Sequence, residues 1–140
     1  MARGEVYRRL VVARAGGACE YCRLLQAAAG VTFHIEHVVP RSRGGATALR
    51  NLALSCPGCN LAKAERTAGL DHEGQPQPLF NPRLYEPWLL GWHLHFLLDR
   101  ESGIIVPRTA IGQATVATLN INDPLRVFAR KLQIQARLLG

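Results

Sequence analysis

The sequence lacks a long hydrophobic run. Although 48% of the residues are hydrophobic, charged or polar side chains interrupt each apolar stretch, well before the roughly 20 residues that a membrane-spanning helix needs. The first residues, MARGEVYRRL, also lack the apolar core of a secretory signal peptide. We therefore expect a cytoplasmic protein with no membrane partner, whose hydrophobic residues form a packed interior.

Acidic residues are few. The chain of 140 residues has 10 Asp and Glu against 17 Lys and Arg, which gives a formal net charge of +7. A positive surplus favours a polyanionic partner, either nucleic acid or an anionic membrane surface. The plainer alternative is that the charge only keeps a small domain soluble. The length fits one domain, or a small core with an appendage.

Cysteine is also scarce, but its four residues form two C-x-x-C pairs: Cys19, Cys22, Cys56 and Cys59. In an intracellular chain this spacing favours zinc over disulfides, because each C-x-x-C turn offers two thiolates to one tetrahedral ion. Glycine and proline beside or inside the pairs favour turns over a redox motif. A closed four-cysteine site has no open coordination position. The zinc would therefore be structural and would take no part in chemistry.

Hydrophobic periodicity and turn residues predict an α+β fold. We expect helices over 4–15, over 110–119, from Pro57 to Gly69 with Ser55 as its cap, and from Pro124 onwards. We expect strands over 31–39, 52–56, 92–99 and 103–109, the last two as a hairpin, and a short helix or turn over 23–30. The proline-rich stretch 71–83 is predicted to be a loop. It would join a core, residues 1–70, to an accessory C-terminal region, residues 71–140, packed on that core.

The segment between the cysteine pairs has the residues that phosphodiester hydrolysis requires. That reaction needs a base to activate water, and neutral imidazole, here His37, is the natural base near pH 7. It also needs a cation to offset charge on the phosphate, and Mg²⁺ or Mn²⁺ prefers oxygen ligands. Glu36 offers a carboxylate, and Asn60, directly after Cys59, offers an amide carbonyl. Asn51, in the connecting loop, could hold His37 in its working orientation.

The run EHVVPRSRGG–LRNLALSCPGCNLAK resembles the HNH endonucleases, whose fold is the ββα-metal fold. By that resemblance His37 is the general base, Glu36 and Asn60 bind the catalytic divalent metal, and Asn51 braces the loop. The resemblance covers residues 19 to 63. Many members of this family have the same four-cysteine zinc site, and the family implies products with 3′-hydroxyl and 5′-phosphate ends. The implied architecture is an HNH core with a C-terminal β-hairpin and helices.

Two positions depart from the commonest HNH pattern. Glu36 stands where Asp is commoner, and Asn60 stands where His is common on the helix, which gives an H-N-N set. Both variants occur in the family, and the loss of an imidazole biases the catalytic site towards hard ions such as Mg²⁺ or Mn²⁺. A softer resemblance to a bacterial subset of these nucleases extends over residues 70 to 140.

The sequence leaves the roles of several other residues undecided. Arg41, Arg43 and Lys63 are predicted to contact nucleic-acid phosphates, with solvated side chains as the alternative. His34 shares the strand face of Glu36 and is either a ligand or an ordinary packed or exposed histidine. Trp88 and Trp92 are expected to pack between the two parts. Two further sets are undecided: His93 and His95 as a second metal site, and Arg126, Arg130, Lys131 and Arg137 as a DNA-binding or merely solvated helix face.

The sequence therefore predicts a metal-dependent endonuclease that hydrolyses DNA. The alternative is a non-catalytic, zinc-stabilised nucleic-acid-binding module, which would not need the set Glu36, His37 and Asn60. A protein-interaction domain and a nuclease acting on RNA are further possibilities. Oligomeric state, sequence preference and biological role stay open, because fold does not name the role.

Overall fold

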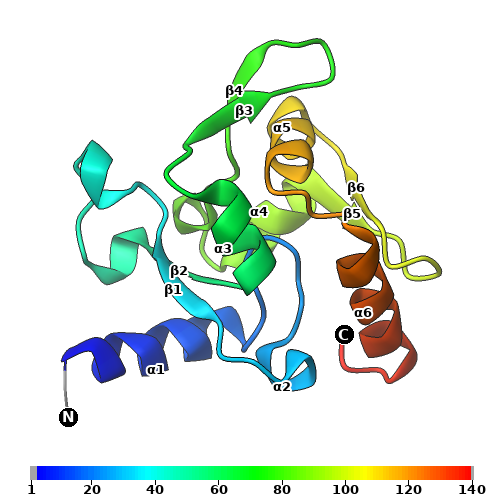
Figure 1. Cartoon of the computed structure of the whole chain (residues 1–140), viewed down its shortest axis with the longest axis horizontal. Coiled ribbons are helices and arrows are strands. Elements are labelled where there is room, and N and C mark those ends of the chain that lie inside the picture. The colour runs from blue at the N-terminus through cyan, green and yellow to red at the C-terminus, as the bar shows by residue number, and fades with distance from the viewer. Residues whose placement is uncertain (1–2, 140) are drawn as a thin grey trace.

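The computed structural model describes residues 3–139 (Figure 1). Its helices are α1 Arg3–Ala15, α2 Gln26–Ala29, α3 Pro57–Lys63, α4 Trp88–His95, α5 Ala110–Thr118 and α6 Pro124–Gln135. Its strands are β1 His34–His37, β2 Leu52–Ser55, β3 Ala68–Leu70, β4 Pro76–Pro78, β5 Phe96–Leu98 and β6 Ile105–Pro107. The strands pair in sequence order as three antiparallel hairpins. The predicted α+β class is confirmed. None of the described helices is both long enough and apolar enough to cross a membrane.

The N-terminal part is built around the β1–β2 hairpin. In its register His34 is opposite Ser55, and His37 is opposite Leu52. All four residues of β2 are buried, and α1 lies along this hairpin (Figure 1). Helix α1 ends as predicted at a glycine pair, because Gly16 and Gly17 have φ of 68° and 72°, a region that glycine enters without steric cost.

Helix α3 differs from the prediction at both ends. Its N-cap is Cys56, not Ser55, because the Cys56 sulfur accepts a hydrogen bond from the Cys59 backbone N–H. The helix stops at Lys63, not at Gly69. Gly69 lies in β3, where a Cβ atom would come within 2.1 Å of the Thr118 hydroxyl oxygen on α5. The glycine therefore permits close packing of β3 on α5 and does not end a helix.

The C-terminal part also contains two corrections. The predicted loop 71–83 includes β4, which pairs with β3. The predicted strand 92–99 is helical up to His95, and only Phe96–Leu98 is extended. The run WLLGWHLH is apolar on nearly every side, and such a run cannot be assigned to helix or strand by periodicity alone. The β5–β6 hairpin, α5 and the helix that starts at Pro124 are confirmed.

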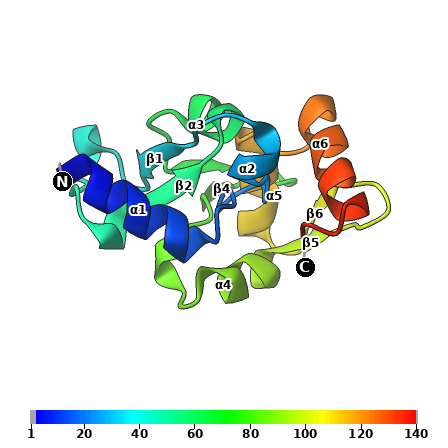
Figure 2. The same cartoon turned by 90° about the horizontal axis from the view of Figure 1, so that it is seen from below.

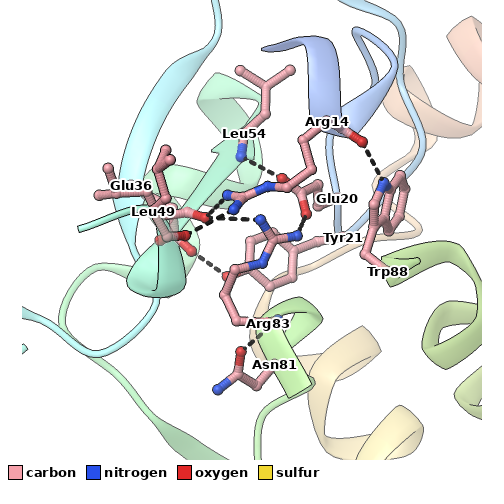
Figure 3. Close-up of polar contacts among 10 residues, drawn as sticks. Arg14, Glu20, Tyr21, Glu36, Leu49, Leu54, Asn81, Arg83 and Trp88 are labelled. Carbon is pink, nitrogen blue, oxygen red and sulfur yellow. Dashed lines mark hydrogen bonds and ion pairs between the residues drawn. The ribbon is translucent and has the colours of Figure 1, made fainter. Parts of the chain in front are cut away.

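One hydrophobic core extends through both parts of the chain. The indole N–H of Trp92 donates to the Tyr21 carbonyl at 2.9 Å, and that of Trp88 donates to the Arg14 carbonyl at 3.2 Å. Both tryptophans thus pack between the parts, as expected. A buried ion pair between Arg83 and Glu20 adds a further link (Figure 3). The predicted division at residue 70 stays a prediction, and the core is continuous across it.

Candidate metal centre and nuclease site

The four cysteines meet in the interior. Their sulfur atoms all lie within 4.8 Å of one another, and each side chain is at most 1% exposed. Four ligands placed 2.3 Å from a tetrahedral zinc would be about 3.8 Å apart, and the Cys22 and Cys56 sulfurs are 3.5 Å apart. A closed, buried set of sulfur donors at this spacing fits a structural zinc ion. It leaves no position for a substrate.

Each C-x-x-C pair forms a tight turn around the cluster. The backbone N–H of Cys22 points at the Cys19 sulfur at 3.4 Å, and that of Cys59 points at the Cys56 sulfur at 3.3 Å. Burial raises the pKa of the Cys19 and Cys59 thiols, because a buried thiolate without a counterion is unfavourable. A divalent cation would supply that counterion.

A second, open site lies beside the metal centre. It is a surface pocket of about 330 Å³ formed by β1, the turn after it and α3. Its lining includes the predicted site residues Glu36, His37 and Asn60, and also His34, whose role the sequence left undecided. The general base and the two oxygen ligands expected from the sequence therefore face one pocket. Asn60 directly follows Cys59, so the metal centre and this pocket share helix α3.

His37 is partly buried, and its Nε2 lies 2.8 Å from the Thr47 hydroxyl oxygen. Burial, with a smaller effect from the Arg41 charge, lowers the pKa of His37 below its ordinary value. The imidazole is therefore neutral at pH 7, the form that can accept a proton. Thr47 was missed by sequence reasoning, since a threonine in a glycine-rich loop has no distinguishing spacing to His37.

Glu36 is buried, with its carboxylate held from two sides. The Tyr21 hydroxyl donates to Oε1 (Figure 3), and the Lys63 ammonium lies 3.4 Å from Oε2. Burial raises the pKa of Glu36, while Lys63 and Tyr21 partly offset that rise. A carboxylate has about four lone-pair sites, so these two contacts leave acceptor capacity towards the pocket. Neither partner of Glu36 was predicted.

The two asparagines have different surroundings. Asn51 exchanges two hydrogen bonds with Val39, at 2.9 and 3.0 Å, and donates a third to the Ala46 carbonyl at 2.9 Å. These bonds hold the turn that follows β1, which is where a bracing residue would act. Asn60 is partly exposed at the pocket wall. Its backbone N–H donates to the Cys56 carbonyl at 2.9 Å, which fixes its position relative to the cysteines.

Comparison with known protein families now bears on these two sites. Residues 19–66, about a third of the chain, match the family model of the HNH endonuclease. The chain contains an HNH endonuclease domain. The match includes both cysteine pairs, Glu36, His37, Asn51 and Asn60, so the family resemblance seen in the sequence is confirmed. No curated protein and no solved structure matches the chain.

The basic residues of the HNH domain do not behave alike. Arg41 and Arg43 are exposed in the turn beside the pocket, and Arg43 Nε donates to the Glu65 carbonyl at 3.1 Å. Lys63 is 1% exposed and also donates to the Val38 carbonyl at 2.9 Å. Its ammonium group thus lies inside the HNH domain, not at the surface where a phosphate would be met. The predicted phosphate contacts of all three stay predictions.

Residues outside the HNH domain differ from expectation. His93 and His95 lie on helix α4, not on one strand face, and His95 bonds Tyr85 and Thr109 at 2.9 and 2.6 Å. Among residues 3–139, no cluster of three or more His, Cys, Asp or Glu side chains other than the cysteines could share an ion. The four basic residues of α6 and its end form no common face, since Arg130 is fully buried while Lys131 and Arg137 are exposed.

Proposed function

We propose that this protein is a metal-dependent endonuclease that hydrolyses phosphodiester bonds of DNA, with His37 as general base. The HNH domain already indicates a nuclease that acts on nucleic acid. The observation that carries the finer proposal is the open pocket that gathers Glu36, His37 and Asn60, beside a metal centre that is closed. The closed site suits a structural ion, whereas the open pocket has a partly buried imidazole next to oxygen donors.

Each side chain of the pocket has a separate role in the proposed hydrolysis. His37, kept neutral by its lowered pKa, takes a proton from the attacking water. Asn51 supports the proposal by holding the turn that follows β1, and the Thr47 hydroxyl contacts Nε2 of the imidazole. A divalent cation such as Mg²⁺ or Mn²⁺, bound by oxygens of Glu36 and Asn60, would offset the negative charge of the phosphate and the leaving oxygen. We expect 3′-hydroxyl and 5′-phosphate ends.

Exposed arginines beside the pocket support a nucleic-acid substrate. Arg41 lines the pocket and Arg43 follows it in the same turn. Contacts with phosphates dominate the affinity of such proteins and weaken steeply with salt. Digestion of duplex DNA, single-stranded DNA and RNA side by side separates DNA cleavage from the alternative of RNA cleavage.

A plasmid-nicking assay with Mg²⁺ or Mn²⁺ tests the proposal. We expect His37→Ala to reduce the nicking rate at least about 100-fold, the contribution of a general base. The matched control is His72→Ala, which removes an exposed histidine from the turn between β3 and β4. Equal cutting by wild type and His37→Ala, or no cutting by the wild type with either metal, would refute the catalytic role.

The second candidate function is a zinc-stabilised module that binds nucleic acid without cutting it. The observation in its favour is that both oxygens of Glu36 already have partners in the protein, Tyr21 and Lys63. Wild-type protein that binds DNA at low salt, yet leaves the plasmid intact with either metal, would establish this function.

A further inference from the structure

Helix α6 reaches the metal centre from far along the chain. Arg126, 67 residues after Cys59, directs its Nη1 at the Cys59 sulfur at a distance of 3.0 Å. The other nitrogen of its guanidinium, Nη2, donates to the Leu119 carbonyl at 2.8 Å and also to the Asn120 carbonyl. The guanidinium is therefore fixed between the end of α5 and a cysteine of the HNH domain.

The second cysteine turn is shaped to receive this arginine. A Cβ atom on Gly58 would lie 3.0 Å from Arg126 Nε and 3.1 Å from its Cζ. These distances are too short for comfortable packing, so the absence of a side chain at position 58 lets the guanidinium cross the turn. Gly58 has no positive φ that would otherwise require glycine. A side chain at position 58 would press against Arg126, and the guanidinium would have to shift by a few tenths of an ångström.

Charge gives the reason for this contact. Four thiolates around one Zn²⁺ have a net charge of about −2, and a buried charge needs compensation. The guanidinium of Arg126 lies against this cluster, with its Nη1 3.0 Å from the Cys59 sulfur. Arg130, one helical turn further and fully buried, is held by the Gly103 and Ile121 carbonyls and by Asn122. Arg126 thus places one positive charge directly against the cysteines, and Arg130 is buried one turn further along α6.

We infer that Arg126 is an outer-sphere residue of the metal centre, and that α6 supplies the positive charge which stabilises a zinc tetrathiolate at Cys19, Cys22, Cys56 and Cys59. This inference rests on the proposed structural zinc. It makes the C-terminal helix a part of the metal centre of the HNH domain. Zinc retention and the docking of α6 are therefore coupled, although all four ligands lie within residues 19–59.

Zinc retention by the full-length protein tests this inference. Competition with a chromogenic chelator measures the zinc affinity of the wild type, of Arg126→Gln and of Arg126→Lys. We expect Arg126→Gln to bind zinc about 10- to 100-fold more weakly, the usual cost of removing an outer-sphere partner. Arg126→Lys, which keeps the charge but lacks the planar fork, should lose less. The control is Lys131→Gln, an exposed charge on the same helix.

A spectroscopic readout separates this contact from a general loss of stability. In protein loaded with Co²⁺, we expect the sulfur-to-cobalt charge-transfer band to move to lower energy in Arg126→Gln, because a hydrogen bond to sulfur stabilises the sulfur lone pair. If Arg126→Gln does not fold, Arg126→Met, which lacks both the charge and the hydrogen-bond donor, provides the same measurement. Unchanged zinc affinity and an unchanged band in the folded variants would refute the inference, as would wild-type protein that binds no zinc. Neither readout depends on DNA cleavage, so failure of the nuclease proposal would be detected separately in the nicking assay.

Discussion

The four-cysteine centre and the open pocket beside it share one short helix, yet they have opposite properties. The metal centre has four sulfur atoms, all buried and close together, whereas the pocket has oxygen and nitrogen donors and opens to solvent. Cys59 and Asn60 are consecutive residues of α3 and face different sites, because side chains one position apart on a helix point about 100° apart. A helix of seven residues can therefore serve folding on one face and chemistry on the other.

The two sites also differ in how far they depend on distant parts of the chain. The pocket is assembled from β1, the turn after it and α3, all within the HNH domain. The metal centre has its ligands in the same domain but receives Arg126 from α6, which lies at the opposite end of the molecule from α1 (Figures 1 and 2). The local site carries the proposed reaction, and the cysteine site is joined to α6 by the Arg126 contact.

Separate substitutions of the neighbours Cys59 and Asn60 should differ most in their effects on zinc binding and stability. We expect Cys59→Ser to lose bound zinc and the folded state, because the binding free energy of structural zinc is about 10–16 kcal/mol in small zinc domains. Asn60→Ala should keep zinc and unfold at nearly the wild-type temperature, while DNA nicking falls. Metal analysis, thermal unfolding and the nicking assay measure the three effects. A stable, zinc-free Cys59→Ser protein would contradict this division of roles.

The buried pair of Lys63 and Glu36 should give the next largest effect. Lys63→Met leaves a buried carboxylate without its countercharge, and we expect a loss of about 3–5 kcal/mol in the free energy of unfolding. The double variant Lys63→Met/Glu36→Gln should lose less than the two single losses added. Chemical denaturation measures all three variants. If Lys63 instead serves only to contact DNA, its removal will leave unfolding unchanged and will reduce the salt dependence of DNA binding.

Arg41 should have a smaller effect, confined to nucleic-acid binding. We expect Arg41→Gln to weaken DNA binding uniformly across sequences and to reduce the slope of log affinity against log salt by about 1. Arg137→Gln, which removes an exposed charge after α6, is the control. Fluorescence anisotropy at several salt concentrations provides the slopes, and equal slopes for both variants would show that the turn after β1 does not contact DNA.

The smallest expected effect is the contribution of His95 to the pH dependence of the free energy of unfolding. Burial lowers the pKa of His95 below the ordinary value of 6.5, so the native state binds fewer protons than the unfolded state. Its contribution to stability is complete above pH 6.5 and is lost progressively as the pH falls below that value. His95→Gln should therefore show a shallower decrease in the free energy of unfolding on acidification. Loss of any bound zinc at low pH would affect both proteins alike, so the difference between their slopes, measured by denaturation, is the test.

Local signals in the sequence were read correctly where one physical cause dominates. Gly16 and Gly17 end α1 because their positive φ favours glycine, and Pro124 opens α6 because its missing N–H costs nothing in a first helical turn. The spacing of the cysteines likewise predicted their convergence. The strand prediction was wrong for residues 92–95, where an apolar segment fits a buried helix or a strand equally well. The predicted helix end at Gly69 was also wrong, because its partner Thr118 is remote in sequence.

The sequence by itself determined the ligand types, the HNH motif and the presence of a base beside oxygen donors, because these follow from residue chemistry at short spacing. Only the tertiary structure decided which basic side chains are buried and which are exposed to a ligand. It buried Lys63 against Glu36 and turned Arg126 and Arg130 of α6 inwards, while Arg41 stayed exposed. The direction that a basic side chain takes depends on which segments pack around it, and spacing within one helix or turn does not contain that information.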